Sequence, residues 1–369
     1  MKKLGFGLMR PPMIGEEVDM AQMCQMVDSF IAAGFNYFDT APTYMGGKNE
    51  ELMRDAVVKR YPREEIILAS KLPLWYAEEK NLSMQEIWDQ SMERTQAGYY
   101  DYYLLHAMNK KWIEAADRVG AWQFMQDKKA KGLVRKIGFS FHDTPEVLEQ
   151  ILSSHPEMEF VQLQINYADW NSEKVRAGEC YEVARKYNKP IIVMEPVKGG
   201  TLASLSPVME EVFSQVNPEA SVASWALRFV AEKEGIQTVL SGMSTIEQVQ
   251  DNIKVLDEVQ PFTEEERAAV VKVQNMIATA PQVACTACSY CTEECPMNIN
   301  IPRLFRAYNY FLNYGNRQIA GEIYDSAIKE RGKACECIGC GNCESHCPQQ
   351  LSIRNILKKI ADVFEEINC

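Results

Sequence analysis

The sequence predicts an α/β protein: a closed (β/α)8 barrel followed by a small, mainly helical domain. In the first two-thirds of the chain, short apolar runs alternate with amphipathic helical stretches, an order typical of parallel strands joined by helices. Eight such runs occur, mostly roughly 30 to 40 residues apart, and eight β/α units close a barrel. They lie at residues 4–9, 35–41, 66–72, 102–106, 134–141, 160–165, 191–195 and 238–241.

Several local signals support the intervening helices. Residues 19–33 carry apolar side chains at the spacings of one helix face. Thr144-Pro145 offers a cap with proline in the first turn, and Ser244 with Glu247 forms a capping-box pattern. An open, doubly wound sheet is the competing architecture, but no G-x-G-x-x-G motif follows an early strand. In a barrel, the loops after the strand carboxyl ends carry the chemistry.

The pattern of the chain changes near residue 260. Thr263 and Glu266 form another capping-box pattern, which predicts a helix before the cysteine-rich part of the chain. Residues 301–333 are rich in Tyr and Phe and are expected to be helical. We therefore expect a barrel domain over residues 1–260 and a small α-helical domain over residues 261–369.

Composition and charge exclude several classes of protein. Of 369 residues, 46% are hydrophobic and 24% charged, as in a globular protein with a large core. A net charge of −12 disfavours nucleic acid as a partner, because that contact needs clustered Lys and Arg. The apolar start is too short for a signal peptide and no run could span a bilayer, so we expect a cytoplasmic protein without membrane contact. Disulfides are rare there, so twelve cysteines, nine between Cys285 and Cys347, indicate metal.

The cysteines repeat one spacing, C-x2-C-x2-C-x3-C-P, twice. The runs are Cys285, Cys288, Cys291, Cys295 and then Cys337, Cys340, Cys343, Cys347. Such a run suits a [4Fe–4S] cluster, and in two-cluster proteins the fourth cysteine of each run ligates the other cluster. The expected ligand sets are therefore Cys285, Cys288, Cys291 with Cys347, and Cys337, Cys340, Cys343 with Cys295. Two zinc sites are the alternative, but zinc needs only two C-x2-C pairs per ion.

The doubled motif resembles that of bacterial-type ferredoxins. The 41 residues between Cys295 and Cys337 look helical, which is more similar to the α-helical ferredoxin domains of fumarate-reductase-type subunits than to the compact βαβ form. An extra thiol, Cys335, stands two residues before Cys337. We leave Cys335 out of the ligand set because it would be separated from Cys340 by four residues.

Four polar residues stand at or just after successive predicted strand ends: Asp39, Tyr44, Lys71 and His106. Reduction of a carbonyl needs a hydride at carbon and a proton at oxygen. A phenol is a poor acid at its usual pKa of about 10, and an adjacent ammonium lowers that pKa. A buried carboxylate keeps the ammonium charged, and an imidazole N–H can polarise the carbonyl. Taken singly, each residue has an ordinary structural interpretation.

In order, motif and strand position, these four residues match the tetrad of the aldo/keto reductase family, which the chain resembles over about residues 4–256. The resemblance implies that Tyr44 is the general acid, that Lys71 tunes it, that Asp39 pairs with Lys71, and that His106 orients the substrate. It also implies NAD(P)H bound across the barrel mouth without a Rossmann fold.

The same resemblance implies a set of cofactor-binding residues. Ser140 and Gln162 would bind the nicotinamide carboxamide. The loop over the pyrophosphate would comprise Pro196, Val197 and Gly199, and the adenosine-phosphate segment Gly242, Ser244, Gln248 and Asn252. Met194 replaces the ring that usually stacks on nicotinamide, and Gln248 replaces an arginine that often holds the 2′-phosphate. The choice between NADP and NAD therefore stays open.

The expected function is NAD(P)H-linked reduction of a carbonyl, or the reverse oxidation, with two [4Fe–4S] clusters that transfer electrons or stabilise the structure. The partners would be a small carbonyl or alcohol substrate and a redox partner protein. The alternative is an electron-transfer or redox-sensing protein whose barrel binds nucleotide without reducing carbonyls. Four further residues follow strand ends and line either the substrate pocket or a packed loop: Trp75, Tyr76, Met108 and Trp170.

Overall fold

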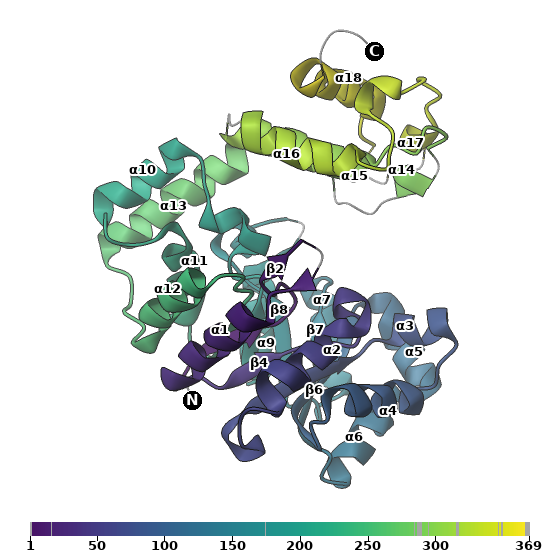
Figure 1. The fold of residues 1–369 in the computed structure, drawn as a ribbon, viewed down its shortest axis with the longest axis vertical. Helices are drawn as coiled ribbons and strands as arrows, with labels where there is room; N and C mark the ends of the chain where they lie inside the picture. Colours follow the sequence, from purple (N-terminus) through teal and green to yellow (C-terminus); the bar gives the residue numbers. More distant parts are fainter. Residues whose placement is uncertain are drawn as a thin grey trace. The chain divides into compact units, whose positions relative to one another are not determined.

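The computed structural model describes residues 2–15, 17–173, 175–283, 285, 290–293, 295–314, 317–345, 347 and 350–365. The chain divides into two compact units, which we describe separately (Figure 1). The first comprises Met1–Ser204 and Phe213–Val271, and the second comprises Leu205–Val212 and Lys272–Cys369.

Eight parallel strands of the first unit close a barrel, which confirms the predicted fold (Figure 1). In barrel order after β1 (Leu4–Gly7) they are β10 (Ile236–Ser241), β9 (Ile191–Met194), β8 (Phe160–Gln164), β7 (Val134–Phe141), β6 (Tyr100–Met108), β5 (Ile67–Leu72) and β4 (Tyr37–Asp39). A short antiparallel hairpin, β2 (Met13–Ile14) with β3 (Glu17–Val18), follows β1. Each strand coincides with one predicted apolar run, with ends that differ by a few residues.

The register of the barrel aligns the polar strand ends. Asp39 is the last residue of β4 and pairs with Ala69 of β5, so Lys71 stands two residues further toward the carboxyl end. Side chains alternate between the two faces of a strand, so Ala69 and Lys71 share a face. One cluster of buried side chains packs in the barrel: Tyr37, Ala69, Tyr102, Leu104, Phe160, Ile192 and Leu240.

Helices surround the barrel (Figure 1). They are α1 (Met20–Ala32), α2 (Lys48–Met53), α3 (Leu74–Lys80), α4 (Met84–Thr95), α5 (Lys110–Val119), α6 (Ala121–Ala130), α7 (Pro145–Ser154), α8 (Tyr167–Trp170), α9 (Ala177–Lys186), α11 (Val222–Ala231) and α12 (Ile246–Asp257). Short turns of helix add η1 (Tyr44–Gly47), η2 (Arg54–Val58), η3 (Arg63–Glu65) and η4 (Lys198–Ala203). The chain also forms α10 (Pro207–Val216) and α13 (Glu264–Thr279).

The predicted helix starts are confirmed with one exception. Pro145 is the first residue of α7, and Thr263 and Glu266 form the expected reciprocal capping box before α13. The predicted capping box at Ser244 is wrong. Thr245 is the N-cap of α12, and its hydroxyl oxygen accepts a hydrogen bond from the backbone N–H of Gln248. The sequence pattern was ambiguous, because Ser244 has Glu247 three positions later and Thr245 has Gln248. In the structure the Ser244 hydroxyl instead donates to the Arg10 carbonyl oxygen.

The second unit is helical around its own core. It contains α14 (Tyr290–Glu293), α15 (Ile301–Tyr314), α16 (Arg317–Ile328), η5 (Ala334–Glu336), α17 (Asn342–Ser345) and α18 (Ile353–Phe364). The predicted helical stretch at 301–333 is thus confirmed as α15 and α16. Ile299, Leu304, Tyr324, Leu357 and Ile360 are among the buried core residues. Among the described residues, no helix is long and apolar enough to cross a membrane.

Candidate active site and metal centre

Lys71 and Asp39 form a buried ion pair at the carboxyl ends of neighbouring strands. The Lys71 Nζ donates to Asp39 Oδ1 at 2.5 Å and to the Thr40 carbonyl oxygen at 2.9 Å. Burial acts to lower the pKa of Lys71, but the Asp39 charge and the Tyr44 hydroxyl outweigh it, so the pKa is raised. The ammonium is therefore charged at neutral pH although its side chain is out of contact with solvent.

Tyr44 begins η1 and lies against this ammonium. The Lys71 Nζ is 4.8 Å from the centroid of the Tyr44 ring. Burial raises the pKa of Tyr44, and the Lys71 charge and hydrogen bond oppose it without cancelling it, so the net pKa is raised. Lys71 thus lowers the pKa of Tyr44 as expected, but the cost of removing a phenolate from water is larger than this attraction. The hydroxyl keeps its proton at neutral pH.

His106 completes the group from β6. Its ring meets the Tyr44 ring edge-on, with 5.9 Å between centroids, and packs against Trp75 at 4.7 Å. Burial, and then the charges of Lys71 and His142, hold the pKa of His106 well below its usual value, so the imidazole is neutral. Its Nδ1 is buried, and no described residue hydrogen-bonds to it. The structure thus brings all four predicted residues together.

A buried asparagine that the sequence analysis missed supports this group. Asn49 of α2 accepts a hydrogen bond from the Thr40 hydroxyl and donates to the Leu8 carbonyl oxygen, both at 2.6 Å. The Thr40 carbonyl in turn accepts from Lys71. Asn49 therefore links the ends of β1 and β4 to the ammonium. In the sequence Asn49 lies five residues after Tyr44. That position points to a role in the site only once Asn49 is known to contact Leu8 and Thr40.

Replacing Asn49 by Ala is expected to lower the free energy of unfolding of the barrel by about 1–3 kcal/mol, because two buried polar groups lose their partner. Urea unfolding followed by tryptophan fluorescence measures this, since all six tryptophans lie in the first unit. Asn36→Ala is the control, because Asn36 donates a single hydrogen bond at the surface and its loss should cost under about 0.5 kcal/mol. Equal effects of the two substitutions would contradict the assigned role.

The two predicted nicotinamide-binding residues lie on neighbouring strands, and one of them, Gln162, contacts the Lys71–Asp39 pair. Ser140 and Gln162 pair in register on β7 and β8, and both are buried. The Gln162 Nε2 donates to Asp39 Oδ2 at 3.2 Å, and the Ser140 hydroxyl oxygen accepts from the Ala107 amide at 2.7 Å. Both side chains are therefore oriented by the strands that carry the candidate catalytic group.

The other predicted cofactor residues lie on the loops after β9 and β10 and, for Gln248 and Asn252, on the helix α12 that follows β10. Gly199 has φ of +64° and approaches Arg10: a Cβ there would stand 3.4 Å from the guanidinium. Ser244 donates to the Arg10 carbonyl oxygen, so both loops meet the segment after β1. Pro196 and Val197 precede Gly199, and Gly242 and Gln248 flank Ser244. Asn252 is separate from this set: it is buried, and its amide donates to the Ser241 hydroxyl at 2.7 Å.

A polar network on the same rim was not predicted. The Lys198 Nζ pairs with the buried Asp169 Oδ1 at 2.5 Å, and Asp169 Oδ2 accepts from Gln164 and Asn166. Asn166 also donates to the Glu195 carbonyl oxygen, which ties the end of β8 to the loop after β9. In the sequence, Asn166 and Asp169 follow the end of β8. Amide and acid residues in that position are found both as helix caps and in functional sites, so the sequence alone did not identify this network.

Of the candidate pocket residues, Trp75 contacts His106, whereas Trp170 packs on Tyr181 and Phe229 and Met108 is fully buried. Trp170 and Met108 therefore serve packing. Tyr76 lies near Lys80, with the Lys80 Nζ 5.9 Å from its ring centroid.

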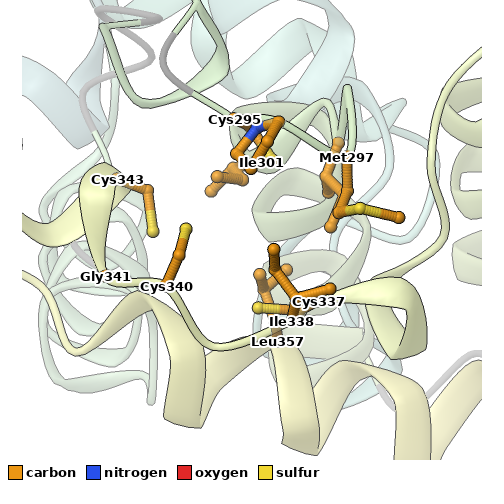
Figure 2. A pocket seen from close by; sticks show the side chains of 11 residues that line it. Cys295, Met297, Ile301, Cys337, Ile338, Cys340, Gly341, Cys343 and Leu357 are labelled. Carbon is orange, nitrogen blue, oxygen red and sulfur yellow. The ribbon is translucent and has the colours of Figure 1, made fainter.

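In the second unit, four cysteines line one cavity (Figure 2). They are Cys295, Cys337, Cys340 and Cys343, the set predicted for one cluster from two separate runs. Apolar side chains, including Ile299, Ile301 and Leu357, form the rest of the wall. Among the described residues, no three potential ligand side chains are placed to hold a single metal ion. Thiols spaced around an apolar cavity fit a polynuclear cluster.

The second predicted ligand set is only partly described. Cys291 is buried in the core of this unit, and Cys285 and Cys347 pack against that core. Cys288 lies outside the described residues. Cys335, which the sequence analysis left out, lies in η5 and is disulfide-bonded.

The first unit is thus a closed parallel barrel with a buried polar group at the strand ends, and the second unit contains a cysteine-lined cavity. The model of the aldo/keto reductase family matches residues 3–275, and that of a 4Fe-4S dicluster domain matches residues 284–352. The chain belongs to the aldo/keto reductase family and is an NAD(P)H-dependent oxidoreductase with an iron–sulfur domain.

Known proteins resemble the first part of the chain. An uncharacterised oxidoreductase of Bacillus subtilis, YqkF, is 25% identical over 73% of this chain and 92% of its own length. The NADH-specific methylglyoxal reductase of Escherichia coli is 23% identical over 64% and 83%. A Klebsiella pneumoniae aldo-keto reductase solved in complex with NADPH has a TM-score of 0.57 at 22% identity, covering 74% of this chain and 90% of that one. This structural likeness shows the fold.

Proposed function

We propose that the barrel reduces a small-molecule carbonyl compound, or oxidises the corresponding alcohol, with NADPH or NADH. The observation that supports this most directly is the Tyr44 hydroxyl beside the Lys71 ammonium, which is itself paired with Asp39. In this proposal Tyr44 is the general acid, Lys71 tunes it, and Asp39 keeps Lys71 charged and oriented. His106 orients the substrate.

The chemistry follows from the charges of these groups. The nicotinamide, when bound, supplies a hydride to the carbonyl carbon. Tyr44 holds its proton at neutral pH because burial raises its pKa, and it donates that proton to the carbonyl oxygen. As the proton leaves, the adjacent Lys71 charge stabilises the phenolate that forms. The neutral His106 carries one N–H, which can hold the carbonyl oxygen toward Tyr44.

We assign different parts of the cofactor to different residues at the barrel mouth. Ser140 and Gln162 would hold the carboxamide of the nicotinamide, since they pair in register on β7 and β8 and Gln162 contacts Asp39. The pyrophosphate and adenosine-phosphate groups would lie on the loops after β9 and β10 and on the first turn of α12. The residues are Pro196, Val197, Gly199, Gly242, Ser244 and Gln248. Asn252 would act through Ser241, to which its amide is bonded. Relatives include an NADPH complex and an NADH-specific enzyme, so the test compares both coenzymes.

We also propose two [4Fe–4S] clusters in the second domain, over about residues 261–369. Cys295, Cys337, Cys340 and Cys343 would hold one, and Cys285, Cys288, Cys291 and Cys347 the other. The cavity shared by cysteines of both runs supports the first assignment. A cytoplasmic location suits clusters ligated by reduced thiols.

Replacing Tyr44 by Phe is expected to lower carbonyl turnover by about 10²–10⁴-fold, because the proton donor is lost while the ring remains. Anaerobically reconstituted protein would be assayed for oxidation of NADPH and NADH with a panel of aldehydes and ketones. Wild-type turnover should be level between about pH 6.5 and pH 10, since the pKa of His106 is lowered and that of Tyr44 raised. Tight nucleotide binding without any turnover in the wild type would instead select an electron-transfer or sensing protein.

A further inference from the structure

Ile338 and Cys340 line the cysteine-lined cavity in the second domain (Figure 2), and with Gly339 between them they form a run of three exposed residues. We call Ile338, Gly339 and Cys340 the exposed cluster edge. Ile338 is 64% exposed, although it lines the cavity and stands between two proposed ligands. Cys343, by contrast, is 6% exposed and belongs to the core of the domain. One ligand of the proposed cluster, Cys343, is therefore buried in the domain core, whereas another, Cys340, is exposed to solvent.

An exposed ligand matters because electron exchange between proteins falls steeply with the distance between their redox groups. A partner that contacts Cys340 reaches the cluster through a single side chain. A lone exposed isoleucine is ordinary on a protein surface. Next to an exposed metal ligand, however, Ile338 offers an apolar contact from which a docked partner can exclude water.

The neighbouring helix α18 determines the charge of this edge. Its Leu357 lines the cavity, and its Arg354 donates to the Gly339 carbonyl oxygen at 3.3 Å. The carboxylate of Glu344 pairs with Arg354 at 2.7 Å and neutralises it. Lys358 is exposed one turn further along the same side of α18 and leaves a positive surplus. On a chain of net charge −12, the exposed Lys358 favours contact with an acidic group of a partner at this place.

We propose that the exposed cluster edge docks a small acidic one-electron carrier protein of the flavodoxin or ferredoxin kind. Cys295, Cys337, Cys340 and Cys343 would hold the cluster, which would accept one electron from the reduced cofactor of the carrier. No bond is made or broken and no proton moves, and the reverse transfer uses the same contact. The inference rests on the proposed ligation of that cluster but not on the chemistry proposed for the barrel.

The test uses the full-length, anaerobically reconstituted protein mixed with reduced flavodoxin, with cluster reduction followed by visible absorbance in a stopped-flow instrument. Lys358→Glu should lower the second-order rate constant about tenfold at low salt and much less at high salt. Ile338→Gln should lower it by a similar factor at both salt concentrations. Lys359→Glu is the matched control, because Lys359 is the next exposed residue of α18 but points to its other flank; its effect should be under about twofold.

Iron content and the electron paramagnetic resonance spectra must be unchanged in all three variants, which shows that the clusters are intact. Reduction by the small cation radical of methyl viologen should be unaffected by Ile338→Gln. Equal effects of Lys358→Glu and Lys359→Glu, or no effect of Ile338→Gln, would overturn the proposal. The proposal would also be overturned if all three variants reacted with flavodoxin at the wild-type rate but their clusters were reduced more slowly by NADPH. That result would instead assign this edge to the barrel of the same chain. Tyr44→Phe should leave the flavodoxin reaction unchanged, so failure of the barrel mechanism is recognised separately.

Discussion

Replacing Lys71 by Met is expected to lower carbonyl turnover by about 10²–10⁴-fold and the free energy of unfolding of the barrel by about 3–5 kcal/mol. The two effects have different causes. Turnover falls because the phenolate that forms on Tyr44 loses its only described cationic neighbour. Stability falls because the buried Asp39 carboxylate is left without the ammonium that compensates its charge. Steady-state assays and tryptophan-monitored urea unfolding measure them separately.

The double variant Asp39→Asn with Lys71→Met is the control for this experiment. It removes both charges, so most of the lost stability should return, whereas turnover should stay low. The pH dependence offers a further check. The pKa of Lys71 is raised on folding, so its stabilising contribution is complete below its unfolded value of about 10.4 and is lost as pH rises further. A Lys71→Met variant that is as active as the wild type would rule out the proposed mechanism.

Replacing Cys295 and Cys343 by Ser in separate variants is expected to remove the same one of two clusters, although the two residues belong to different runs. Each variant should retain about four of eight iron atoms per chain and lose the same spectral component, because one thiolate of four is missing in each. Cys291→Ser should remove the other component. Iron analysis and electron paramagnetic resonance of the reduced protein measure this.

Cys24→Ser is the matched control, because Cys24 lies on α1 of the barrel unit, far in sequence from either run. It should leave iron content unchanged. If Cys295→Ser and Cys291→Ser removed the same component, each run would supply a whole cluster and the exchange of fourth ligands would be wrong. Loss of all iron in every cysteine variant would show that neither cluster folds into place alone.

Much of the fold could be read from local patterns. The eight apolar runs each became a barrel strand because strand and helix periodicities depend on neighbouring residues only. The gathering of Asp39, Lys71 and His106 also followed from sequence, since residues at the carboxyl ends of parallel strands meet at one rim. The cysteine spacing predicted that Cys295 joins the second run, and the cavity contains that set.

Tertiary structure alone decided quantities that depend on burial and on distant partners. The net pKa of Tyr44 is raised, because the desolvation caused by the packed barrel mouth outweighs the lowering effect of Lys71. The choice of Thr245 over Ser244 as N-cap depended on the Arg10 carbonyl, which is remote in sequence. The link from Asn49 to Lys71 through Thr40 crosses three chain segments. Spacing determines which residues can meet, but solvent exclusion and long-range hydrogen bonds exist only once the chain is folded.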